Sequence, residues 1–121
     1  MFVQTVEVSL TTDASGDATG YTDNLRGLLD RIQYVKTDFA DGVDFTITLE
    51  STGETLWAES DVNSSAVRAP RQATHATDGT ASLYAASGEP VESRIAIEGR
   101  VKIVVANGGD TKSGTFRVTV F

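Results

Sequence analysis

Residues 101–121 read VKIVVA, then NGGDTKSG, then TFRVTVF, and this stretch decides the fold class. Val, Ile, Thr and Phe fill the two outer runs, and these side chains favour the pleated surface of a β-strand. The loop between the runs begins with Asn107, Gly108 and Gly109, which tolerate the positive φ angles of a tight connection. The stretch therefore predicts two β-strands joined as a hairpin.

The same alternation of apolar and polar residues runs through the rest of the chain. It is clearest in residues 43–50, where every second side chain is apolar, and it also marks residues 2–11. Further strands are predicted at 18–22, 28–37, 55–59, 81–85 and 94–97. A hairpin turn is predicted at Thr52-Gly53. Residues 23–27 fit either a turn or a bulged continuation of the next strand. Closely spaced strands with turn signals between them predict one all-β domain over residues 1–121. Its expected form is an antiparallel β-sandwich or barrel of seven to nine strands, and a jelly roll is one version of this architecture.

The apolar faces of these strands predict the hydrophobic core. We expect the core to contain Val6, Val8, Ile32, Tyr34, Phe45, Ile47, Leu49, Ile103, Val105, Phe116 and Val118.

Composition excludes several classes of protein. The chain has no Cys, which rules out disulfides and thiolate metal sites. No apolar run approaches the roughly 18 residues of a membrane span, and the first residues lack the features of a signal peptide, so we expect no membrane partner. A net charge of −7 is unsuited to nucleic acid, which needs clustered Lys and Arg.

This charge is unevenly distributed. Residues 1–61 hold twelve acidic and three basic residues, a net charge of −9, whereas residues 62–121 hold five acidic and seven basic residues, a net charge of +2. The excess of acids serves solubility. It also fits a dipolar subunit whose two faces meet different neighbours.

No pattern indicates an enzyme, a metal or a cofactor. His75 is the only histidine and lies in a polar stretch without a nucleophile-elbow motif. Asp13, Ser15 and Asp17 open like a calcium loop, but position 12 of that loop is Asn24 rather than Glu. A polar β-turn explains these residues without a metal. A cluster of Asp38, Asp41 and Asp44 is expected to be a solvated turn, and paired carboxylates for glycoside hydrolysis are the least favoured alternative.

The candidate partner-binding residues are Trp57, Arg68, Pro70, Arg71 and His75. After Asp61, residues 62–77 hold no acid but two Arg and one His, which fits either an extended basic arm lying on an acidic neighbour or a plain surface loop. Pro70 argues against a central strand in this region. Trp57 lies beside a turn and out of phase with Leu56, so it is either a core residue or an exposed stacking residue.

Several segments together resemble a family of viral proteins. They are residues 10–21 (LTTDASGDATGY), residues 32–39 (IQYVKTDF), residues 69–72 (APRQ) and the closing VKIVVANGG run. In this combination, nearly the whole chain resembles small proteins encoded among the virion structural genes of tailed bacteriophages.

The resemblance implies a structural role without chemistry. It suggests a capsid decoration (cement) protein, made in the host bacterial cytoplasm, which assembles as a homotrimer on the outer capsid surface and bridges major capsid protein subunits. One alternative is a carbohydrate- or receptor-binding module of the virion, which an exposed Trp57 beside Tyr21 or Tyr84 would favour. The other is a tail or head–tail connector component.

Overall fold

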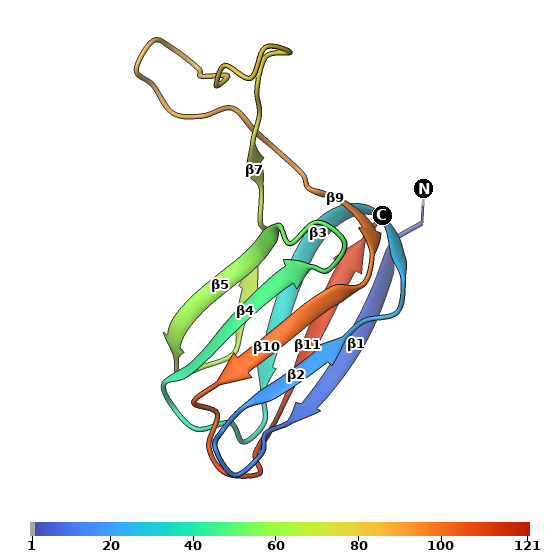
Figure 1. Cartoon of the computed structure of the whole chain (residues 1–121), viewed down its shortest axis with the longest axis vertical. Coiled ribbons are helices and arrows are strands. Elements are labelled where there is room, and N and C mark those ends of the chain that lie inside the picture. The colour runs from blue at the N-terminus through green and yellow to red at the C-terminus, as the bar shows by residue number, and fades with distance from the viewer. Residues whose placement is uncertain (1) are drawn as a thin grey trace.

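The computed structural model describes residues 2–121, and these form an all-β sandwich from which one long segment projects (Figure 1). The strands are β1 (Gln4–Thr11), β2 (Ala18–Tyr21), β3 (Leu25–Lys36), β4 (Val43–Leu49), β5 (Thr55–Val62), β6 (Ala66–Arg68), β7 (Gln72–Ala73), β8 (Glu92–Ser93), β9 (Ala96–Gly99), β10 (Val101–Ala106) and β11 (Ser113–Val120). A five-stranded and a four-stranded sheet make up the sandwich, and β7 with β8 forms a separate ribbon. The predicted fold class is confirmed.

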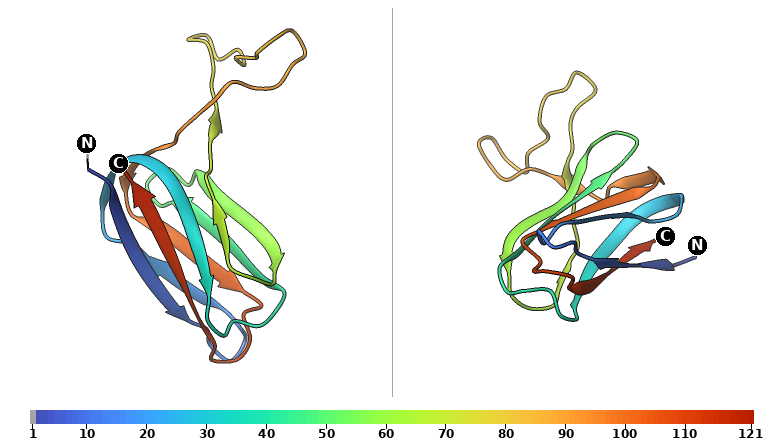
Figure 2. Two further views of the ribbon diagram at one scale, coloured as in Figure 1. Left: turned by 180° about the vertical axis from the view of Figure 1, so that it is seen from behind. Right: turned by 60° about the horizontal axis from the view of Figure 1, so that its bottom comes forward.

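The order of the strands identifies the sandwich as a jelly roll. One sheet has the order β1-β11-β3-β6 and the other the order β2-β10-β4-β5, and all pairs are antiparallel. If β7, β8 and β9 are left out and the remaining eight strands are renumbered 1 to 8 along the chain, the two sheets have the orders 1-8-3-6 and 2-7-4-5. This is the jelly-roll arrangement of two four-stranded sheets. Figure 2 shows the two sheets face to face, with the projecting segment leaving the end at which both termini lie.

The hairpin predicted for residues 101–121 is wrong. β10 pairs with β2 and β4, whereas β11 pairs with β1 and β3, so residues 107–112 cross from one sheet to the other. Packed sheets lie about 10 Å apart and neighbouring strands about 4.8 Å, so this crossing needs a longer loop than a hairpin does. Asn107 has a φ of 60°. The sequence therefore marked the turn correctly but not the sheet that the chain enters next.

The core lies between the two sheets. All predicted core residues are buried except Val6 and Val8, which pack against the core but stay half-buried. The ring of Tyr34 lies 5.2 Å from the rings of both Phe45 and Phe116, measured between centroids. The same aromatic cluster includes Phe39, from the loop between β3 and β4. Burial of these rings contributes to the hydrophobic stabilisation of the domain.

The N-terminal end of β3 runs beside the C-terminal residue, Phe121. Residues 25–28 pair with β9, so the bulged continuation of residues 23–27 into the next strand is confirmed from Leu25 onward. Gly27 has a φ of 139°, and a Cβ at this position would lie 2.6 Å from the carbonyl oxygen of Phe121. Only glycine therefore allows β3 to pass so close to the chain end.

Two further predictions concern hairpins and short strands. The Thr52-Gly53 turn does join β4 to β5 as an antiparallel hairpin. Residues 81–85, predicted as a strand, contain only isolated bridges, from Ala81 to His75 and from Leu83 to Pro90. Among residues 2–121 there is no helix with the length and hydropathy of a membrane span.

Candidate partner-binding site

Four of the five predicted site residues line one open groove. The groove has a volume of about 450 Å³ and runs between β5 and the chain that leaves β6. Its walls include Trp57 on one side and Arg68, Pro70 and Arg71 on the other. His75 lies outside the groove, on the projecting segment, where it bridges to Ala81. The sequence therefore located a real surface feature, although the roles of its residues differ from the expected ones.

Trp57 is a packing residue. Its side chain is only 7% exposed, and its ring meets the ring of Phe45 edge-on at 4.8 Å. Its indole Nε1 donates a hydrogen bond to Glu59 at 3.0 Å, and the guanidinium of Arg68 lies 5.6 Å from the ring centre. The core interpretation of Trp57 is confirmed, and little of the ring is left to stack on a ligand.

Arg68 is bound within its own chain. Its Nε and Nη2 donate to the two carboxylate oxygens of Glu59, both at 3.0 Å. The hydrogen bonds from Arg68 and then from Trp57 hold the pKa of the Glu59 carboxyl below its ordinary value. Because Arg68 belongs to one sheet and Glu59 to the other, this two-point ion pair closes the β5–β6 side of the sandwich.

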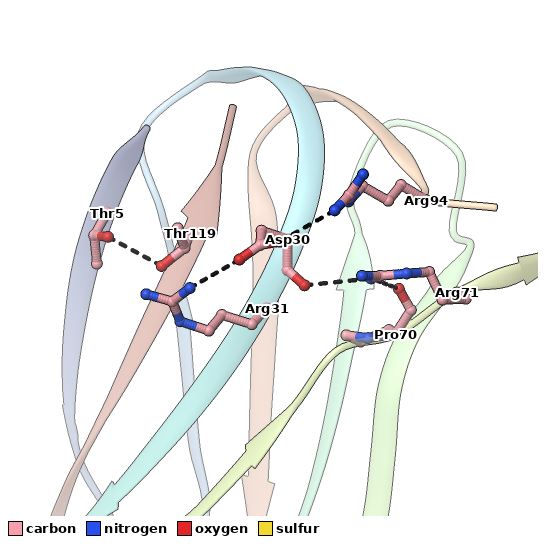
Figure 3. Close-up of polar contacts among 7 residues, drawn as sticks. All are labelled: Thr5, Asp30, Arg31, Pro70, Arg71, Arg94 and Thr119. Atoms are coloured by element: carbon pink, nitrogen blue, oxygen red, sulfur yellow. Dashed lines mark hydrogen bonds and ion pairs between the residues drawn. The ribbon is translucent and has the colours of Figure 1, made fainter. Parts of the chain in front are cut away.

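Arg71 anchors the base of the projecting segment (Figure 3). Its Nη1 donates to the carbonyl oxygens of Pro70 (2.8 Å) and Asp30 (3.3 Å). The carboxylate of Asp30 lies 3.8 Å from Arg94 and accepts a hydrogen bond from Arg31 at 2.8 Å. Asp30, Arg71 and Arg94 therefore hold both ends of the segment against β3, and we call these three residues the root clamp.

The segment between the two ends of the clamp, residues 72–93, is the arm. No residue from Arg71 to Arg94 is buried. The arm nevertheless bonds to itself: Thr74 N donates to Val91 O (2.9 Å), Ser82 N to Thr74 O (3.0 Å) and Val91 N to Ser82 O (2.9 Å). These bonds join a stem to two small lobes, which end in the turns around residues 76–80 and 84–89.

Tyr84 lies outside the predicted partner-binding set, but its exposure makes it a candidate site residue. It lies on the second lobe of the arm with 76% of its surface exposed, beside Leu83, which is 40% exposed. A large aromatic side chain on a projecting lobe is the kind of residue that anchors protein–protein contacts. Its signal in the sequence was the apolar run at residues 81–85, which was interpreted as a strand.

The arm is not basic. Both arginines of the predicted basic arm lie at its base, and the arm itself carries Asp78, Glu89 and Glu92 against His75 alone. The acids are separated from one another by sequence and by the two lobes. The projecting arm therefore shares only residues 72–77 with the predicted basic segment, and its most exposed large hydrophobic side chains are Tyr84 and Leu83.

The acidic residues of the calcium-like turn and of the Asp38, Asp41 and Asp44 cluster have partners within the chain. Asp13 accepts hydrogen bonds from the backbone N–H groups of Ser15 (2.9 Å) and Asp17 (3.0 Å), as in a polar turn. Asp44 accepts from Asp61 N and Asn107, while Asp38 accepts from Ser113 N and Asp41 pairs with Lys36. Among residues 2–121, no three His, Cys, Asp or Glu side chains are grouped as a metal site requires.

Comparison with known proteins assigns no family to this arrangement. No protein-family model matches the sequence, and no curated protein matches it either.

Proposed function

We propose that the chain is a bacteriophage virion protein, a capsid decoration protein that bridges neighbouring major capsid subunits on the outer surface of the head. The arm is the observation that carries the proposal. It extends from a well-packed sandwich, has no core of its own, and presents Tyr84 and Leu83 to solvent. In this proposal the sandwich rests on one subunit and the arm reaches the next.

An arm of this kind suits docking better than any internal role. Holding a segment of this length in one shape costs conformational entropy, and the arm buries no side chain that would offset this cost. Loops this long in compact domains are usually functional. Docking of the arm on a partner would supply the missing burial, with Tyr84 as the central anchor.

The root clamp would increase the strength of such docking. Asp30, Arg71 and Arg94 fix the direction in which the arm leaves the sandwich. An arm that is already oriented loses less freedom on binding than a free tail does. Attachment then stabilises the assembled particle by mass action, with no chemical step.

The fold adds support by analogy. Double-sheet jelly rolls are frequent in viral capsid proteins and also in lectins. Because one fold serves many functions, the analogy alone does not select between them. The resemblance to phage structural proteins favours the capsid, and the burial of Trp57 removes the main stacking residue of a glycan groove.

The test uses heads from the phage whose genome encodes the chain, purified from a deletion of this gene. Purified wild-type protein and the variants Tyr84→Ala and Tyr21→Ala are added to these heads and pelleted with them. Tyr21 is the matched control, because it is an exposed tyrosine on the sandwich whose ring is covered by Arg100 at 4.1 Å.

We expect the wild type and Tyr21→Ala to bind and to raise the heat resistance of the heads, and Tyr84→Ala to lose about 10-fold or more in affinity. Equal binding by Tyr84→Ala would remove the arm from the proposal. A change in host adsorption without a change in heat resistance would favour the receptor-binding alternative. Binding only to isolated tails would favour a tail or connector role.

A further inference from the structure

The two lateral sides of the sandwich differ in the contacts made by their edge strands. On the β5–β6 side, the Arg68–Glu59 ion pair joins the two sheets, and Lys36 donates to the carbonyl oxygen of Asn63 at 3.0 Å. On the opposite side, β1 is the last strand of its sheet and pairs only with β11. This leaves the outward N–H and C=O groups of β1 without a strand beside them.

β1 lacks the features that usually protect an edge strand. It runs in regular register with β11 over all eight residues, without a bulge. Its sequence, QTVEVSLT, contains neither Pro nor Lys, and its one charge, Glu7, already pairs with Arg117 at 2.9 Å. A long, regular and nearly neutral edge is a template for another strand.

The core is also incomplete along this edge. Val6 and Val8 face the core but remain half-buried, and the residues that precede the strand, Phe2 and Val3, are 91% and 67% exposed. Leu10, at the other end of β1, is covered, because β2 packs so closely there that a Cβ on Gly20 would lie 2.2 Å from Leu10. The exposed apolar surface is therefore confined to the N-terminal half of β1.

We propose that two copies of the chain pair through their β1 strands, antiparallel and about a two-fold axis at Val6. Such pairing must place core-facing residues opposite core-facing residues, because a slip by one residue would turn the apolar side chains to the solvent. Every two-fold register centred on a residue has this parity, and those nearest the middle of β1 centre on Val6, Glu7 or Val8. The register at Glu7 sets like charges opposite each other, which is unfavourable.

The choice between the two remaining registers follows from where the apolar surface lies. Centring on Val8 would shift the pairing toward Leu10, which is already covered. Centring on Val6 sets Val6 opposite its copy and Phe2 opposite Leu10 of the second copy, so it covers the exposed half of the edge. A second copy of the chain is the favoured partner for this edge, because its β1 repeats the same spacing of apolar residues. The pairing would join the two sheets into one continuous sheet.

This inference concerns self-association and stands apart from the proposed role on a capsid. A surface that pairs with itself about a two-fold axis yields dimers, not the homotrimer that the phage resemblance suggested. It is tested on the full chain alone, without heads, so its failure leaves the docking of the arm untouched.

The absence of cysteine in the chain allows a direct test by cross-linking. Val6→Cys, Val8→Cys and Val104→Cys are each oxidised with copper phenanthroline under native conditions. Val104 is the matched control, since it lies on β10 of the other sheet and is 37% exposed. We expect Val6→Cys to form disulfide-linked dimers at least 10-fold faster than the other two variants, because only its thiols meet across the axis.

Light scattering of the wild-type chain at high micromolar concentration provides the second readout. The inference predicts a dimer, which Val6→Lys converts to a monomer and Thr46→Lys, on the exposed face of β4, does not. Circular dichroism confirms that each variant is folded. A wild-type monomer, a trimer, or equal cross-linking of all three cysteine variants would overturn the inference.

Discussion

The sandwich and the arm are built from the same kinds of residues but are held in shape in different ways. In the sandwich, Tyr34, Phe45 and Phe116 are buried against one another between two sheets. In the arm, Tyr84 is mostly exposed, and the lobes are held by hydrogen bonds, most of them between backbone groups, together with one from the Thr80 N–H to the Asp78 carboxylate at 3.0 Å. Hydrogen bonds specify a shape but add little net stability, whereas burial stabilises. We therefore expect the sandwich to fold without the arm, and we propose that the arm is a docking surface.

The largest expected difference between the two regions comes from removing one aromatic side chain in each. Phe45→Ala should lower the free energy of unfolding by about 3–5 kcal/mol, because it leaves a cavity among buried rings. Tyr84→Ala should change it by less than about 0.5 kcal/mol, as for other exposed positions. Urea unfolding followed by tryptophan fluorescence measures both. If Phe45→Ala fails to fold, Phe45→Leu gives a smaller loss, and a comparable loss for Tyr84→Ala would show that the arm packs on the sandwich.

A second difference concerns buried polar groups, which occur in the core, whereas no residue of the arm is buried. Among the described residues, the buried hydroxyl of Tyr34 has no hydrogen-bond partner. Burial, with a smaller contribution from Asp41, raises the pKa of Tyr34 to about 12. Tyr34→Phe should therefore keep or raise stability, by up to about 1 kcal/mol, because no bond is lost and a desolvation cost is removed.

The pH dependence of stability checks the same residue. The folded pKa lies above the unfolded value of about 10, so the unfolded chain releases this proton first. Ionisation of Tyr34 therefore does not change stability below about pH 10, and stability falls as the pH rises from 10 toward 12, because only the unfolded chain has released the proton. Tyr34→Phe should reduce this loss. An equal loss in the variant would show that the hydroxyl has a partner or reaches solvent.

Shortening the arm should have a small effect on stability. Thr74 and Val91 are hydrogen-bonded across the stem, so residues 75–90 can be replaced by Asn-Gly, which favours a two-residue turn. We expect the free energy of unfolding to stay within about 1 kcal/mol of the wild type, since no buried residue is removed and loop closure depends weakly on length. A loss of more than about 2 kcal/mol would contradict the independence of the two regions.

The smallest expected effect is confined to the root clamp. Asp30→Asn weakens the ion pairs to Arg31 and Arg94, which are partly exposed and contribute little to global stability. We expect an unchanged melting temperature and faster hydrogen exchange at the β7–β8 stem. Glu50→Gln is the control, because it weakens an exposed ion pair to Arg100 that involves no residue of the arm or of the root clamp. Equal exchange in the stem for both variants would show that Asp30 does not orient the arm.

The sequence predicted local structure better than it predicted which elements meet. Strand β4 was predicted correctly because its alternation of apolar and polar residues is regular. In the structure it pairs with a strand on each side, β10 and β5. The pairing of β10 was wrong because a glycine-containing loop looks the same whether it forms a hairpin or crosses to the other sheet. Val6 and Val8 were expected in the core, but their cover depends on β2, which is too short to extend along the whole of β1.

The candidate site shows the same limit. Arg68, Pro70 and Arg71 stood out because they interrupt an acidic chain, and they do lie together. Glu59 precedes Arg68 by nine residues and Asp30 precedes Arg71 by 41, and the sequence pattern did not show that these arginines were already paired. Tyr84 was named only in the receptor-binding alternative and not in the partner-binding set, because residues 81–85 have the composition of a strand but no second strand to pair with.

Hydrogen exchange of the full chain, alone and bound to heads that lack this protein, tests the central claim most directly. For the free chain, we predict slow exchange in β4, β10 and β11 and fast exchange in the two lobes of the arm. On binding, protection should appear in residues 76–90 and be lost again in Tyr84→Ala. Protection that appears only in the sandwich strands, with the lobes exchanging as fast as before, would contradict the assignment of the arm as the docking element.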